Sequence, residues 1–235
     1  MFPTLMSKTF FILFLSLSFC FIGAQAVVSY FRNAYKQGAK YIIAKKNPEG
    51  EDDLVIEESF LQVVFWPALI INIISFILLM FTRNSFPINM ICMGLFTFTD
   101  GITLGLVLMT KDENLGVRVA WLTAIVTLFA GTIGLYSNVD FSFLGNILFW
   151  ALIAFIIVSF VRIFVRIKGF TRKLIALIGI VIFVGYLLYD FNNLRKIRKL
   201  ANFNTWNVAL DCSIDIYLDI INLFLQILDL LSDDN

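Results

Sequence analysis

The sequence contains no histidine among its 235 residues. This absence excludes a Ser-His-Asp triad, a HExxH zinc site and haem ligation by histidine. Cysteine is scarce as well, and Cys20, Cys92 and Cys212 lie far apart, each within an apolar segment. Their spacing fits neither a zinc site nor a disulfide framework, so we interpret them as small apolar packing residues.

Charge is also scarce, because only 15% of the residues are charged and 60% are hydrophobic. A soluble domain has about a quarter of its residues charged and about half apolar. The net charge is +1, which gives no reason to expect nucleic-acid binding. The apolar residues form long blocks, as in a multi-pass membrane protein, so the lipid bilayer is the expected environment. Whether that is a bacterial plasma membrane, a eukaryotic endomembrane or the mitochondrial inner membrane stays open.

A membrane-spanning helix needs about 20 mainly apolar residues. Seven segments are candidates: 9–30, 60–82, 88–110, 117–137, 142–165, 173–191 and 208–231. The last carries four aspartates and is the least apolar. The sequence therefore predicts an all-α membrane protein of seven transmembrane helices, with residues 1–235 forming a single polytopic domain.

The start of the chain allows two interpretations. The motif "GAQA" at 23–26 resembles the cleavage site of a signal peptide, but the apolar run continues past it to Tyr30, which favours a retained helix. The polar segment 32–58 is expected to be a surface loop or a short helix outside the membrane. The distribution of Lys and Arg, read by the positive-inside rule, places the N-terminus outside.

The last segment carries a polar stripe. Its members are spaced by 4, 4, 3, 4 and 3 residues, which places them within an arc of roughly 80° on a helix. They are Asp211, Asp215, Asp219, Asn222, Gln226 and Asp229. Each aspartate at the centre of a membrane helix costs about 2.5–3.5 kcal/mol, so the stripe is expected to face the bundle interior, a partner group or water. A peripheral amphipathic helix in the interface is the alternative.

Three other charged residues are candidates to act with the stripe. Asp190 shares a helix face with Tyr186 and precedes the basic run "RKIRK"; it is either a partner of the stripe or a solvated acid paired with Arg195 or Arg198. Asp100 lies in "TDGITLG", and Arg83 ends the second span. Either is a possible partner for the acids or an ordinary interfacial residue.

Four stretches resemble one family. "DGITLG", "GTIGLYSNVDFSFL", "GYLLYDFNNL" and "ALDCSIDIYLDIINLFLQIL" are similar to the Bax inhibitor family, the transmembrane Bax-inhibitor-motif proteins. The likeness covers roughly residues 60–231, and the motifs look most like those of bacterial pH-sensitive calcium-leak members.

The resemblance implies a seven-helix fold with the C-terminal helix in the centre of the bundle. It also implies a pH-sensitive calcium leak and, for eukaryotic or viral members, a role in regulating apoptosis. In the family a proton-sharing aspartate pair on helices six and seven matches Asp190 and Asp219. An arginine that latches to this pair in the closed state corresponds to Arg83, and Asp100 matches a site that is often acidic. The family places the N-terminus in the cytoplasm, opposite to the charge distribution.

The physical hypothesis is a proton-controlled cation path. Two carboxylates close together in an apolar interior cannot both ionise cheaply, so they are expected to share a proton. Loss of the proton or of the Arg83 latch would free oxygens of Asp190 and Asp219 to bind Ca²⁺ as the transported ion. Asp211, Asp215, Asn222 and, less directly, Asp100 are expected to extend the path. No cofactor is expected, and no protein partner can be named.

Two other functions remain as alternatives. One is a non-conducting regulatory or structural membrane subunit of the same fold. The other is an intramembrane aspartyl protease, which also uses two membrane carboxylates. Asp219 follows "IYL" where such enzymes have GxGD, and the Pro-Ala-Leu sequence at Pro67 lies on the wrong helix, so an enzyme is not expected.

Overall fold

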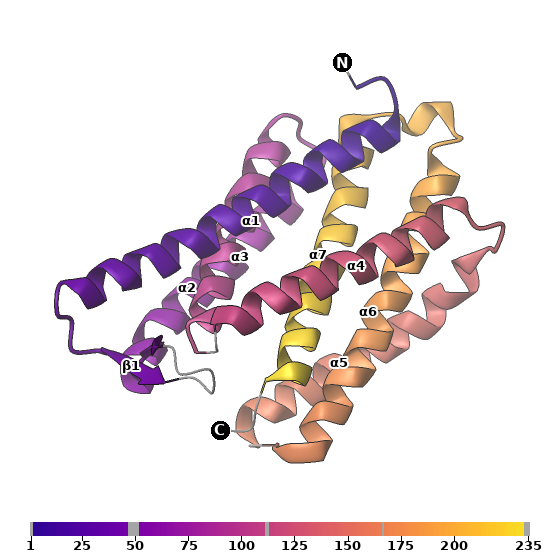
Figure 1. Ribbon diagram of the computed structural model, residues 1–235. Helices are drawn as coiled ribbons and strands as arrows, with labels where there is room; N and C mark the ends of the chain where they lie inside the picture. Colours follow the sequence, from indigo (N-terminus) through magenta and orange to yellow (C-terminus); the bar gives the residue numbers. More distant parts are fainter. Residues whose placement is uncertain (1, 47–51, 111–112, 166, 233–235) are drawn as a thin grey trace. The chain divides into compact units, whose positions relative to one another are not determined.

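A computed structural model describes residues 2–46, 52–110, 113–165 and 167–232, and it is almost entirely helical (Figure 1). In this part of the chain the long helices are α1 (Leu5–Lys36), α2 (Glu58–Thr82), α3 (Ile88–Leu108), α4 (Glu113–Tyr136), α5 (Leu144–Phe164), α6 (Gly169–Ile197) and α7 (Trp206–Leu231). Two short 3₁₀ helices, η1 (Phe141–Phe143) and η2 (Ala201–Phe203), precede α5 and α7. The seven predicted segments thus all fall on helices.

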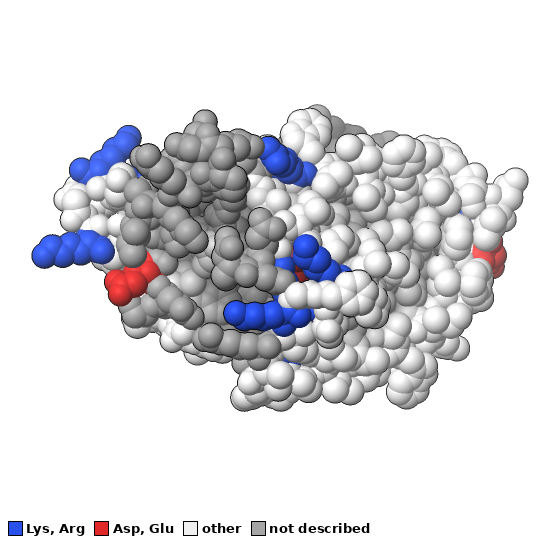
Figure 2. All heavy atoms as spheres, turned by 60° about the horizontal axis from the view of Figure 1, so that its bottom comes forward, with Lys and Arg blue, Asp and Glu red and all other residues white. Residues whose placement is uncertain are grey.

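Six of these helices, α1 to α6, are long and apolar enough to cross a membrane. Many of their large apolar side chains are exposed, such as Phe81 and Phe170, which are 86% and 81% accessible. On the face in Figure 2 the described surface is mainly uncharged, and Lys and Arg side chains lie in only a few places. An apolar surface of this extent suits contact with lipid. Helix α7 is not among the six, and it carries four aspartates.

The chain divides into two compact units. One contains the described residues of 7–116 with the first residues of α7, 206–211; the other contains those of 1–6, 117–205 and 212–235. Each is described separately below.

Close contact between α1 and α3 organises the first unit. A Cβ built on Gly101 of α3 would lie 2.8 Å from the Cα of Cys20 in α1, and one on Gly105 would lie 2.9 Å from the carbonyl oxygen of Ala24. The two glycines of "GITLG" thus let the backbones of α1 and α3 approach closely. Helix α2 packs against α3 in the same unit.

The polar segment 32–58 contains structure that the sequence analysis did not predict. Strands β1 (Ile42–Lys46) and β2 (Asp52–Ile56) form an antiparallel pair in which Ile42 lies opposite Ile56. Helix α1 also continues to Lys36, so the first five residues of this segment belong to a predicted span's helix and not to a loop. Residues 47–51 of this segment lie outside the described part of the chain.

The second unit contains α4, α5, α6 and most of α7. Glycines again mark where helices approach: a Cβ on Gly134 of α4 would lie 2.9 Å from the carbonyl oxygen of Leu188 in α6. Gly145 of α5 similarly lies against the ring of Tyr189 in α6. These contacts hold α6 between α4 and α5 and so fix the helix that carries Asp190.

Candidate functional site

Helix α7 is enclosed along most of its length. Of its 26 residues, only Asp215 and Leu231 are exposed, and Ile216 and Tyr217 are fully buried on the side away from the polar stripe. Protein therefore covers the apolar side of α7 at these residues, and of the polar stripe it covers Asp219, which is 7% exposed. This coverage argues against the alternative of an amphipathic helix lying at the membrane surface.

The structure brings Asp190 of α6 and Asp219 of α7 together, and their carboxyl groups share a hydrogen bond. Asp219 is 7% exposed, and its Oδ2 atom has no hydrogen-bond partner among the described residues. Two carboxyl groups can share a hydrogen bond only if one of them carries a proton. The geometry therefore fits a pair that holds one proton between two helices.

Asp215 adds a third acid to this region. It lies one turn before Asp219 on α7, and its charge acts on both members of the pair. Its own side chain is exposed. A negative charge beside the pair makes it harder for Asp190 and Asp219 to ionise together.

Arg83 forms an ion pair with Asp211. Its Nε lies 2.5 Å from Oδ1 of Asp211, within the first unit. Asp211 stands eight residues before Asp219 on α7, about 12 Å along the helix axis. The structure therefore places Arg83 on the polar stripe of α7, at Asp211, and the predicted latch to the Asp190–Asp219 pair stays a prediction.

Asp100 lies in α3, in the same unit as Arg83. It is half-buried, and Thr103 donates a 2.7 Å hydrogen bond to its backbone oxygen. Neighbouring Thr97 and Thr99 are buried and bond to the carbonyls of their own helix. The predicted role of Asp100 in an ion path stays a prediction.

The clearest interaction that the sequence analysis missed is the ion pairing of Asp229, the last member of the stripe. Arg162 of α5 lies 2.7 Å from its Oδ2, and Arg172 of α6 lies 3.4 Å from its Oδ1. Arg172 is buried and also donates to the backbone oxygen of Ser232. Charged residues near the end of an apolar span usually have a partner, so Arg162 and Arg172 carried a signal that the sequence analysis did not use.

The basic run after Asp190 binds the connection between α4 and α5. Arg195 donates to the carbonyls of Ser137 and Val139, and Lys196 donates to the carboxylate of Asp140. Among the described residues, no ion pair joins Asp190 to Arg195 or Arg198. The alternative of a solvated helix-end acid paired with these arginines therefore does not match the structure.

Asn192 reinforces the same contact and was not predicted. It is 1% exposed, donates to the carbonyl of Val139 at 3.1 Å and accepts from the backbone N–H of Phe141 at 3.3 Å. Because Asn192 lies two residues after Asp190, these bonds fix the turn of α6 that presents the carboxyl group.

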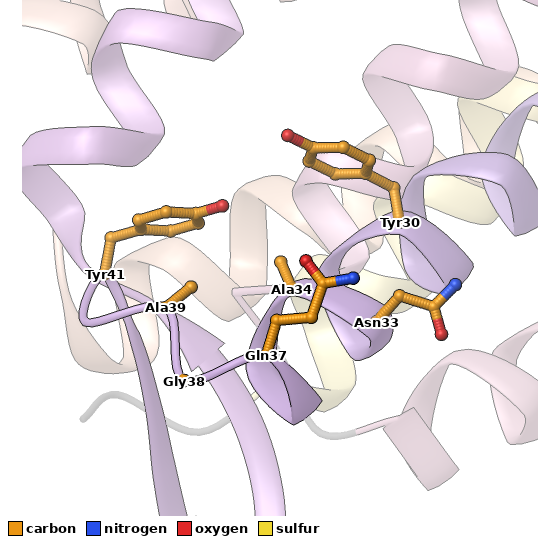
Figure 3. Close-up of a pocket in the computed structure, with 7 residues that line it drawn as sticks. All are labelled: Tyr30, Asn33, Ala34, Gln37, Gly38, Ala39 and Tyr41. Carbon is orange, nitrogen blue, oxygen red and sulfur yellow. The ribbon is translucent and has the colours of Figure 1, made fainter.

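A shallow pocket of about 350 Å³ lies at the end of α1 (Figure 3). The hydroxyl groups of Tyr30 and Tyr41 point toward each other across it, and the side chains of Asn33 and Gln37 line its lower side. The ring of Tyr41 stacks on Phe60 at 4.1 Å. None of the predicted site residues lines this pocket.

The acidic pair does not form a complete metal site. Within the described ranges, no group of three or more His, Cys, Asp or Glu side chains is arranged to hold a metal ion. Ca²⁺ takes six to eight oxygen ligands in a stable site. Asp190 and Asp219 alone supply too few for that.

These features define a multi-pass helical membrane protein with a buried carboxyl pair between its last two helices. Residues 3–235 match the family described as Bax1-I, inhibitor of apoptosis-promoting Bax1. The chain belongs to this family, and the resemblance found in its motifs is confirmed.

Individual relatives come from plants, a virus and a bacterium. LIFEGUARD 1 of Arabidopsis thaliana is 30% identical over 174 residues, which cover 72% of this chain and 71% of that protein. The Golgi anti-apoptotic protein of vaccinia virus (strain Lister) is 35% identical over 153 residues, covering 65% of this chain and 62% of that protein. An uncharacterized Campylobacter jejuni protein is 27% identical over 179 residues, 74% of each chain. The chain thus matches about two thirds to three quarters of the length of these relatives.

Proposed function

We propose that this protein is a pH-sensitive calcium leak, gated by Asp190 and Asp219, with α7 in the centre of the helix bundle. The observation that carries the proposal is the hydrogen bond between the two carboxyl groups, one of them buried, on neighbouring helices. Such groups are costly inside an apolar bundle, and ionisable residues kept in that position usually serve transport or proton relay.

The proposed cycle rests on one proton. While the pair holds it, the shared hydrogen bond ties α6 to α7 and leaves a single negative charge. When the pair loses it, two carboxylates repel each other and present oxygen atoms that a hard cation such as Ca²⁺ can bind. Raising the pH should therefore increase the flux of Ca²⁺.

The test is calcium flux into liposomes containing the purified protein, measured across a pH series. We expect Asp219→Asn to remove most of the pH dependence, because an amide cannot lose the controlling proton. Asp140→Asn is the matched control, since Asp140 is an exposed acid outside the pair. Unchanged flux and pH dependence in the Asp190→Asn, Asp219→Asn double variant would exclude the proposal.

The same assay tests the predicted latch. If Arg83 restrains the closed state, Arg83→Gln should raise the flux at acidic pH, where wild type is closed. Asp211→Asn provides the comparison, because Asp211 is the residue that Arg83 contacts in the structure. Equal flux in wild type and both variants would remove Arg83 from the proposal.

The vaccinia virus relative is named as a Golgi anti-apoptotic protein, which supports a second candidate function. In this alternative the chain restrains cell death in an endomembrane as a regulatory subunit and does not itself conduct ions. Protection from cell death that survives in the Asp190→Asn, Asp219→Asn double variant, together with no flux from wild type, would favour it.

A further inference from the structure

The polar residues of α7 differ in the partners that they contact. Asp211 and Asp229, toward the two ends of the stripe, are paired with arginines of other helices. Between them, Asp219, Asn222 and Gln226 form a continuous run spaced by three and four residues, which places them on one face within about 10 Å along the axis. This run is the part of the stripe whose described polar contacts include no arginine.

Gln226 has an unusual buried oxygen. Its Oε1 atom is buried and accepts no hydrogen bond from any residue that the structure describes, as is true of Oδ2 of Asp219. The amide nitrogen of Asn222 donates to the carbonyl of Leu218 at 2.8 Å, which leaves its oxygen as an acceptor. Buried polar atoms are normally hydrogen-bonded, so two exceptions on one helix face require a reason.

Helix α6 is shaped to admit the Gln226 side chain. A Cβ on Gly179 would lie 2.7 Å from Cγ of Gln226 and 2.8 Å from the ring of Phe155. Glycine thus lets the glutamine lie directly against the backbone of α6. Leucine or methionine would fill the same space without burying a polar atom, so packing alone does not explain glutamine here.

We propose that Gln226 is a further cation-contacting residue, whose amide oxygen continues the row formed by Asp219 and Asn222. The inference rests on the proposed calcium leak and assigns a path to the ion after it leaves the carboxyl pair. Amide oxygens are ordinary ligands of Ca²⁺. A neutral oxygen beyond a charged pair binds weakly enough for the ion to move on, which conduction requires.

The test compares Gln226→Leu with wild type in calcium-flux liposomes and in a thermal unfolding assay. We expect the flux to fall several-fold while its pH dependence is unchanged, because Asp190 and Asp219 remain intact. The melting temperature should stay the same or rise, since the variant removes a buried polar atom. Leu228→Met is the control, because Leu228 is buried on the opposite side of α7, and its flux should match wild type.

A second variant approaches the same side chain from α6. Gly179→Ala should displace Gln226 and lower the flux, with a lower melting temperature because Phe155 is also crowded.

The other outcomes overturn the inference in distinguishable ways. Wild-type flux in Gln226→Leu would remove Gln226 from the path and leave the proposed leak standing. If both flux and melting temperature fall in Gln226→Leu, Gln226 has a packing role. If the pH dependence of the flux changes in Gln226→Leu, Gln226 belongs to the gate. No flux from wild type at any pH would reject the leak itself, and the path with it.

Discussion

Single acidic side chains in this protein have very different surroundings. Asp219 is buried beside another carboxyl group, whereas Asp229 is held by Arg162 and Arg172. Loss of the Asp229 carboxylate would leave two partly buried arginines without this partner, so Asp229 is expected to be structural. Asp140, in contrast, is exposed and paired with Lys196 at the surface.

The Asp140–Lys196 contact gives a testable pH dependence. The hydrogen bond from Lys196, helped by the backbone N–H of Ser142, lowers the pKa of Asp140 from 3.8 to about 2. The ionised form is therefore favoured in the folded state, and its contribution to stability is present above about pH 4 and lost as the pH falls toward 2. The effect should be small, because the carboxylate is exposed to solvent.

We expect wild type to be slightly more stable than Asp140→Asn at pH 6, with the difference closing by about pH 2.5. Melting temperatures in detergent across this range provide the measurement. In a Lys196→Gln background, Asp140→Asn should change the melting temperature less, because the partner of Asp140 is already removed. A gap between wild type and Asp140→Asn that is equally large at both pH values would contradict this assignment.

At the scale of helices, the contact of α1 with α3 depends on the absence of side chains. Gly101 lies against the backbone of Cys20, and Gly105 lies against that of Ala24. Backbone atoms cannot move aside as the end of a flexible side chain can. The small residues therefore set the distance between these two helices, as they often do in membranes.

Gly101→Ala should destabilise the protein by about 1–3 kcal/mol or more, because the added methyl group overpacks the contact. Gly94→Ala on the same helix is the matched control, since its Cβ would meet only the ring of Phe19 at an ordinary 3.6 Å. That control should be neutral or slightly stabilising, because alanine favours helix more than glycine does. Thermal unfolding in detergent measures both, and equal melting temperatures for the two variants would disprove the close contact.

At the scale of the whole molecule, the membrane topology depends on whether α7 crosses the bilayer. Its 26 residues extend about 39 Å, which is long enough to cross a bilayer core of about 30 Å. Its four aspartates set it apart from the six apolar helices. Of its aspartates, Asp219 is buried, and Asp211 and Asp229 are paired with arginines, which lowers the cost of crossing.

If all seven helices cross, the two ends of the chain lie on opposite sides of the membrane. Reporter fusions at each end, read for cytoplasmic or external location, measure this directly. Ends on the same side would show that α7, or one other helix, does not span. The same fusions decide between the orientation given by the Lys and Arg distribution and that of the family.

The helices could be predicted well from the sequence, because the length and apolar character of a segment determine whether it can span a membrane. Sequence reasoning also predicted the stripe of α7 and the closeness of Asp190 and Asp219, the latter through family resemblance. It missed the β1–β2 pair, whose five-residue strands show no alternation of apolar and polar residues. It also missed the partners of Asp229, because ion pairs between distant helices depend on packing that no local spacing reveals.

The arginines that hold Asp229 give α7 a fixed end. Asp219 lies ten residues from this end, about 15 Å along the axis. A tilt of α7 by about 10° around the Asp229 anchor swings the Asp219 carboxyl through roughly 2–3 Å, more than a hydrogen bond tolerates. Under the proposed function, such a tilt would be enough to separate the pair and open the leak.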